Sequence, residues 1–211
     1  MYTLKYKFYD DCIQLTYYKK RSSSRSVSSS SSSSSSEKSK LSRACSRIKD
    51  IILTNDFDYF VTLTSKTALH DSKEISINKF NTYVSNYRKL CKFYGIDFKY
   101  VYVFEKTKKG GIHLHGFFKG FYDLYENQFG YLSSRYFDKL GFQCIEKAKD
   151  VNPYYLIKYI TKEPCYIKQV YHCSRGLKRP NVEYYHDHFK KFLDLPFNFN
   201  NGFCKMITFK K

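Results

Sequence analysis

Two histidines separated by a single residue are the first candidates for chemistry in this sequence. His113 and His115 flank Leu114. Successive side chains of a β-strand point to opposite faces, so in a strand both imidazoles project from one face. That spacing suits two ligands of one metal ion. His186 and His188 have the same spacing, so neighbouring residues must decide which pair matters.

A carboxylate strengthens the first pair. Glu105 stands eight residues before His113, and a short loop at 108–110 would place the two opposite each other on paired strands. Such side chains are about 5 Å apart at Cβ. Two imidazoles and a carboxylate can hold a divalent ion, Mg²⁺ or Mn²⁺ in a phosphate-handling site, although the set also suits Zn²⁺. We therefore predict a metal site at Glu105, His113 and His115; the alternative for Glu105 is a solvated strand end.

A predicted helix downstream interleaves phenols with ammonium groups. Positions i, i+3, i+4 and i+7 share one helical face; here they are Tyr155, Lys158, Tyr159 and Lys162. Neighbouring cations favour a tyrosinate and neutralise a phosphate beside it. We predict Tyr155 and Tyr159 as nucleophiles, Lys158 as the group that stabilises phosphate charge, and Lys162 as a strand contact. The alternative is two amphipathic tyrosines packed at the domain edge.

A basic loop follows the last predicted core strand. Residues 174–180 read Ser-Arg-Gly-Leu-Lys-Arg-Pro. Guanidinium groups and backbone amides suit contacts with phosphates. We predict that Arg175, Lys178 and Arg179 bind a nucleic-acid strand; the alternative is an exposed basic loop without a ligand.

Composition points to a polyanionic partner. The 211 residues fit one domain plus an appendage, and 37 Lys and Arg against 19 Asp and Glu give a net charge of +18. Such a surface suits nucleic acid and excludes cationic partners. The seven cysteines show no C-x-x-C spacing, which predicts free thiols in a reducing cytosol. No apolar run approaches the length of a membrane span, so we expect no membrane partner.

Hydrophobic periodicity and turn residues predict the elements that position these groups. Helices are expected near 38–53, 76–94, 129–140 and 153–162, and strands at 59–64, 100–106, 112–118, 142–147 and 169–173. A hairpin and helices packed on one mainly antiparallel sheet make an α+β domain.

The two ends of the chain are expected to differ from this domain. Residues 1–20 form an N-terminal segment that can provide an edge strand. Residues 21–40 contain nine successive serines, which bury nothing, so we predict a flexible linker. Residues 41–211 then form the main domain with a basic C-terminal extension.

Three motifs in order resemble those of HUH-type replication initiators. They are Phe60-Val61-Thr62-Leu63-Thr64, His113-Leu114-His115 and Tyr155-x-x-Lys158-Tyr159-x-x-Lys162. The pattern is most similar to the Rep proteins of small single-stranded DNA phages of the microvirus and filamentous types, over residues 41–180. The resemblance implies an RRM-like (ferredoxin-like) antiparallel sheet, with the histidine pair on a central strand and the tyrosine helix beside the metal.

The resemblance also implies an activity. It is the metal-dependent, site-specific nicking and joining of single-stranded DNA at an origin, which starts viral rolling-circle replication through a covalent 5′-phosphotyrosine. The sequence has no Walker A motif, so a host helicase would unwind the DNA and a host polymerase would extend the free 3′-OH. The expected location is the cytoplasm of a bacterial host. Which tyrosine attacks first stays open, and Tyr154 is a third candidate.

Two other functions remain open at this point. One is a non-catalytic module that binds single-stranded nucleic acid on the same sheet, although imidazoles and Glu105 stand where a stacking platform would carry aromatic rings. The other is a single-tyrosine HUH transposase, which would work with either tyrosine alone.

Overall fold

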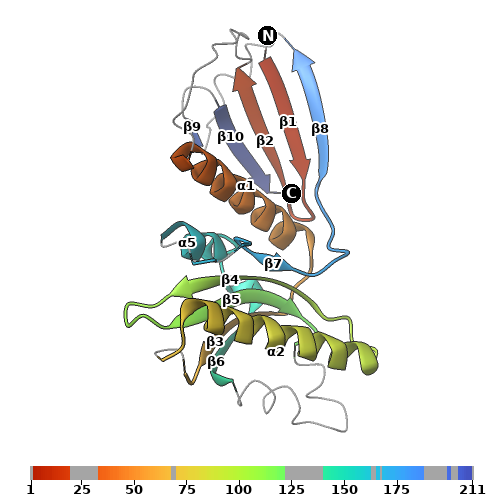
Figure 1. The fold of residues 1–211 in the computed structure, drawn as a ribbon. Helices are drawn as coiled ribbons and strands as arrows, with labels where there is room; N and C mark the ends of the chain where they lie inside the picture. Colours follow the sequence, from red (N-terminus) through yellow and green to blue (C-terminus); the bar gives the residue numbers. More distant parts are fainter. Residues whose placement is uncertain are drawn as a thin grey trace. The chain divides into compact units, whose positions relative to one another are not determined.

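The computed structural model describes residues 2–19, 33–67, 70–121, 140–162, 165–166, 168–187, 199–200 and 204–210. The chain divides into two compact units, residues 36–177 and residues 1–35 with 178–211. Each unit holds one five-stranded antiparallel sheet, and the larger unit adds helices (Figure 1). The predicted α+β class is therefore confirmed.

The sheet of the larger unit has the strand order β6-β3-β5-β4-β7. Its strands are β3 (Tyr59–Ser65), β4 (Lys99–Lys106), β5 (Ile112–Lys119), β6 (Gly141–Lys147) and β7 (His172–Cys173). The histidine pair lies on β5, the central strand, as the resemblance implied. The predicted strand 169–173 is shorter than expected, because β7 pairs only with Val101 and Tyr102 of β4.

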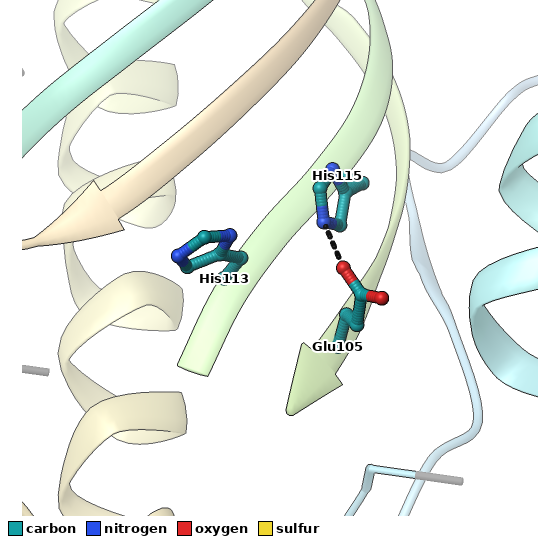
Figure 2. Close-up of side chains that lie close together, drawn as sticks. All are labelled: Glu105, His113 and His115. Carbon is teal, nitrogen blue, oxygen red and sulfur yellow. Dashed lines mark hydrogen bonds and ion pairs between the residues drawn. The ribbon is translucent and has the colours of Figure 1, made fainter. Parts of the chain in front are cut away.

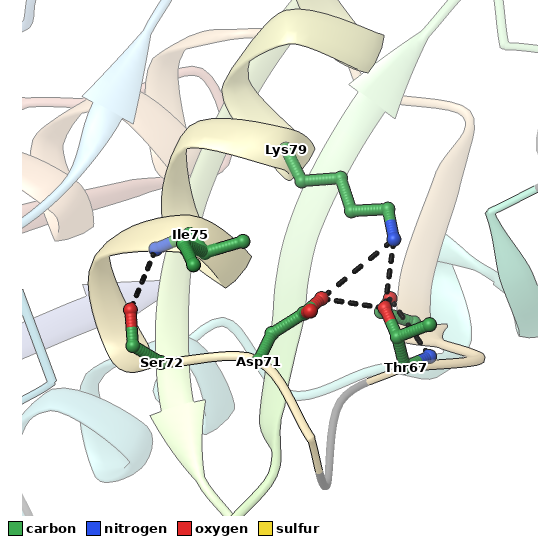
Figure 3. A network of polar contacts seen from close by, with 6 residues as sticks. Thr67, Asp71, Ser72, Ile75 and Lys79 are labelled. Carbon is green, nitrogen blue, oxygen red and sulfur yellow. Dashed lines mark hydrogen bonds and ion pairs between the residues drawn. The ribbon is translucent and has the colours of Figure 1, made fainter.

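Helix α2 (Lys73–Phe93) covers one face of this sheet. Ser72 caps its first turn by accepting a hydrogen bond from the backbone N–H of Ile75 at 3.3 Å. The preceding turn is tied to the helix because Lys79 donates to Thr67 and lies 3.7 Å from Asp71 (Figure 3). The apolar side chains of this face form one core, which includes Leu63, Ile77, Phe80, Val84, Phe104, Leu114 and Phe118.

Two further helices, α1 (Ser33–Thr54) and α5 (Tyr155–Lys162), pack on the opposite face. Their buried residues meet those of the strands in a second core, which includes Ile48, Ile51, Phe60, Val101, Val103, Phe117, Leu156 and Ile160. Strand pairing places the histidine pair on this same face, because His115 lies opposite Val103 and Thr62.

Helix α1 corrects the predicted linker. The helix begins at Ser33, so a flexible linker over 33–40 is wrong. Glu37, Lys38 and Lys40 are good helix formers, and they extend the helix ahead of its first apolar residue, Leu41. The rest of the linker lies outside the described residues, as does the predicted helix at 129–140 except for Leu140, which lies in a turn before β6.

The smaller unit corrects the predicted edge strand. Its sheet has the order β8-β1-β2-β10-β9, with β1 (Tyr2–Phe8), β2 (Cys12–Lys19), β8 (Asn181–Asp187), β9 (Phe199–Asn200) and β10 (Cys204–Lys210). The N-terminal segment therefore forms a hairpin whose strands both lie inside a sheet. The C-terminal residues supply the other strands, so they are more than a basic extension of the main domain. No helix in the described part of the chain combines the length and apolar character needed to cross a bilayer.

Candidate metal centre and tyrosine helix

The β4–β5 hairpin brings the three predicted metal ligands together. Glu105 pairs directly with His113, and the ligand atoms of Glu105, His113 and His115 all lie within 4.8 Å of one another (Figure 2). The Nε2 atom of His115 is 3.0 Å from Oε2 of Glu105. Adjacent ligands of an octahedral ion at about 2.1 Å are separated by about 3 Å. The donor set and its spacing therefore fit a divalent ion.

Burial keeps both imidazoles neutral. His115 is only 4% exposed. Burial, with a smaller contribution from the charge of His113, lowers the pKa of His115 to about 3. Burial also lowers the pKa of His113. A neutral imidazole has a lone pair to offer a metal ion, so neither histidine must lose a proton before it can bind one near pH 7.

A third strand orients the buried histidine. Thr62 on β3 pairs with His115, and its Oγ1 lies 2.9 Å from Nδ1 of His115. The second nitrogen, Nε2, is then the one that faces Glu105. Hydrogen bonds of this kind set the tautomer and ring orientation of metal-binding histidines. We did not predict this role for Thr62, because alternation along the strand shows which face Thr62 occupies but not which residue it meets.

Helix α5 places its tyrosines against the histidine pair. The ring of Tyr159 stacks on that of His115, with centroids 3.8 Å apart and an interplanar angle of 3°. The ring of Tyr155 meets Tyr159 edge-on at 5.3 Å and is 44% exposed. Leu156 and Ile160, on the other side of the helix, are buried. The predicted division of this helix into a tyrosine face and a core face is therefore confirmed.

The expected ionisation of the tyrosines is wrong for Tyr159. Burial raises the pKa of Tyr159, and its hydrogen bond with Tyr155 and the nearby carboxyl groups of Glu105 and Glu146 raise it further. Lys158 lies instead 5.5 Å from the ring centroid of Tyr155. The phenol of Tyr159 is therefore neutral at pH 7 and must lose its proton as it reacts.

Other predicted site residues are not gathered around this cluster. The N–H of Ser174 donates to the carbonyl of Tyr100 at 2.9 Å, which places the start of the basic loop at the far end of β4. Tyr100 is five residues from Glu105, about 17 Å along a strand, so Arg175 does not reach the cluster. Lys178 and Arg179 are exposed and belong to the smaller unit.

Two of the remaining candidates fall partly or wholly outside the described residues. Lys162 is the last residue of α5, and its side chain is not described. His186 lies in β8 and His188 lies outside the described residues. Tyr154, the third candidate nucleophile, is exposed, and Lys49 lies 5.3 Å from its ring centroid.

An exposed aromatic ring beside the cluster was also not predicted. Phe142 on β6 pairs with Thr64, which in turn pairs with His113, so all three side chains share one row on one face. Phe142 is 71% exposed. An aromatic side chain in a strand is normally read as core, and only the sheet order shows that Phe142 lies on an edge strand.

Comparison with known proteins gives one match. The model of the replication-associated protein ORF2 family matches residues 58–164, which is just over half of the chain and includes all three predicted ligands and both tyrosines. Searches of curated proteins and of solved structures found no significant match. The chain therefore belongs to the replication-associated protein ORF2 family, which indicates a role in the initiation of rolling-circle replication.

Proposed function

We propose that this protein is a metal-dependent, site-specific endonuclease and strand transferase that nicks and joins single-stranded DNA at a viral replication origin. The observation that carries the proposal is the stacking of Tyr159 on His115. It puts a phenol beside three side chains whose donor atoms suit a divalent ion. Membership of a replication-associated family supports DNA as the substrate.

The reaction is a transesterification. The phenol oxygen forms a bond to phosphorus, the bond from phosphorus to the 3′-oxygen breaks, the phenol loses its proton and the 3′-oxygen gains one. The products are a 5′-phosphotyrosine and a free 3′-OH that a host polymerase can extend. One ester replaces another without water, so the reverse reaction joins strands. Mg²⁺ or Mn²⁺ held by Glu105, His113 and His115 would polarise the scissile phosphate. Lys158 is exposed on the same helix and can offset phosphate charge.

Two tyrosines serve a full round of replication better than one. After the first cut, one phenol remains esterified to DNA, so closing the circle requires a second acceptor. Tyr155 and Tyr159 are one helical turn apart with their rings in contact. Both therefore lie near the same phosphate position, and the protein can alternate between them without releasing the strand.

The test uses Tyr155→Phe, Tyr159→Phe and the double variant. Each protein is incubated with origin-bearing single-stranded DNA and Mn²⁺, denatured, and examined for a protein–DNA adduct. We expect partial adduct from each single variant and none from the double. Phenylalanine keeps the ring contacts, and Tyr154→Phe is the matched control.

Each alternative predicts a different result. Loss of all adduct in one single variant and none in the other would favour a single-tyrosine, transposase-like reaction. Adduct in the double variant would show that another residue is the nucleophile. DNA binding by the wild-type protein without any adduct would favour a non-catalytic binding module.

The proposal also places the protein in its setting. A virus-encoded initiator that lacks a helicase motif depends on a host helicase and polymerase, in the cytoplasm of a bacterial host. The net charge of +18 suits recruitment to DNA at low and moderate salt.

A further inference from the structure

A basic cavity lies in the larger unit, away from the metal cluster. Its volume is about 470 Å³, within the range of small-ligand sites. It lies between α1 and the segment 168–173, and its lining consists of Lys40, Arg43, Ala44, Arg47, Lys168, Gln169, Val170, Tyr171 and Cys173. All of these residues lie outside the part of the chain that the family model matches. The family's known reaction therefore does not account for them.

The charge of this basic cavity has one sign. Lys40, Arg43, Arg47 and Lys168 line it, and among the residues that the structure describes no Asp or Glu does. Three of the cations stand at i, i+3 and i+7 on α1, so they form a row on one helical face that is about 10 Å long. A row of that length is longer than one phosphate group and matches successive phosphates of a strand.

Local contacts hold some of these cations in place. The ammonium group of Lys40 donates to the carbonyl of Lys168 at 3.4 Å and lies 4.8 Å from the ring centroid of Tyr166. The Nε of Arg43 donates to the carbonyl of Ser39 at 3.2 Å, which anchors the guanidinium group at the helix surface. Cations that are already positioned lose less conformational freedom when an anion binds.

The rest of the lining suits bases rather than a small inorganic anion. Ala44 and Val170 are buried and provide an apolar floor. Tyr171 is partly buried and provides an aromatic ring. Proteins that bind single strands without reading sequence combine these features: a positive groove for the backbone and aromatic rings for the bases.

The basic cavity and the metal cluster lie on the same face of one sheet. Cys173 pairs with Val101, and Val101 is four residues from Glu105 on β4, about 13 Å along the strand. A few nucleotides can cover that distance. A strand cut at the cluster can therefore reach the basic cavity within the same unit.

We infer that the basic cavity binds the phosphate backbone of single-stranded DNA, as a second contact for the strand that is cut at the metal cluster. The identity of the strand rests on the proposed function. The binding itself does not, because it follows from the charge, the length and the lining of the basic cavity.

The test removes three of its cations. The triple variant Arg43→Gln, Arg47→Gln, Lys168→Gln changes exposed side chains only. The control changes three exposed cations of α2, on the other face of the sheet, and carries the same net charge: Arg88→Gln, Lys89→Gln, Lys92→Gln. Affinity for a 20-nucleotide single-stranded DNA is measured by fluorescence anisotropy without metal, over a range of salt.

The expected loss follows from counterion release. Each lost contact with a single strand reduces the salt slope by about 0.7 and the affinity at 0.1 M salt by about fivefold. The triple variant should therefore bind roughly 100-fold more weakly with a slope smaller by about 2, while the control changes far less. The single variant Arg43→Gln should lose about fivefold, which gives a second measurement if the triple variant does not fold.

Two results would overturn the inference. Equal losses in the cavity variant and the α2 control would show that only total charge matters. Unchanged DNA binding by the cavity variant, with loss of ATP binding, would make this a site for free nucleotides. Adduct formation by the wild-type protein is measured in parallel, so failure of the proposed function, which is no adduct, is distinct from failure of the cavity.

Discussion

The hydrogen bond between Thr62 and His115 should control metal affinity. Thr62→Val replaces the hydroxyl with a methyl group of similar size, so packing is largely kept while Nδ1 of His115 loses the partner 2.9 Å away. His115 is almost completely buried, and no solvent can take the place of the hydroxyl. When Nε2 binds an ion, Nδ1 must carry the proton, and that N–H would then have no acceptor.

The magnitude follows from this lost partner. A buried polar group without a hydrogen bond costs about 1–3 kcal/mol, which corresponds to roughly 5–150-fold in an equilibrium constant. The cost falls on the metal-bound form, because the free imidazole can change tautomer. We therefore expect metal affinity to fall by about 10–100-fold, as for other changes beside metal ligands.

The assay is the rate of adduct formation as a function of Mn²⁺ concentration, together with calorimetric titration of the ion. Thr62→Val should raise the half-saturating Mn²⁺ concentration while the rate at saturation stays within a few fold of wild type. Thr62→Ser keeps the hydroxyl and should restore the wild-type value. Thr64→Val makes the same change two residues along β3 and is the matched control.

One result would refute this reasoning directly. If Thr62→Val binds Mn²⁺ as tightly as the wild-type protein, the hydroxyl does not orient the ligand. If Thr62→Ser is as weak as Thr62→Val, the effect belongs to packing at this position rather than to the hydrogen bond.

Three other substitutions test the remaining parts of the site. His113→Ala or His115→Ala should reduce adduct formation by at least about a hundredfold, since Lewis-acid stabilisation is worth several kcal/mol, with DNA affinity nearly unchanged by anisotropy; wild-type activity in excess chelator would contradict this. Phe142→Ala should leave thermal stability unchanged and weaken single-strand binding by about 1–3 kcal/mol if a base stacks on the ring; unaltered affinity would exclude stacking. Gly116→Ala should lower the free energy of unfolding by about 1–3 kcal/mol, because its Cβ would lie 2.6 Å from Cβ of Tyr102; an unchanged denaturation midpoint would show that β5 can shift.

Short-range features of the site could be predicted from the sequence. The two histidines face the same way because alternate residues of a strand always do. Glu105 meets His113 because a short loop between them fixes the register of the hairpin. The tyrosines of α5 share a face because positions four apart are one turn apart. Each of these follows from the geometry of one element or of two elements joined by a few residues.

Contacts between distant segments required the tertiary structure. Thr62 and His115 are 53 residues apart in the chain, and the stacking of Tyr159 on His115 joins a helix to a strand more than 40 residues earlier. The predicted edge strand β1 has a partner, β8, nearly 180 residues away. Periodicity shows which face of an element is apolar, but packing of the whole core decides which elements meet.

The environment of a side chain depends on the same packing. From the cations beside it in sequence, Tyr159 was expected to ionise readily, whereas burial and two carboxyl groups from other elements raise its pKa. The basic cavity likewise joins α1 to a segment more than 120 residues later. Chemistry encoded by local spacing was readable from the sequence alone. Chemistry that depends on desolvation, or on groups brought together by the fold, appeared only once the two cores were assembled around the sheet.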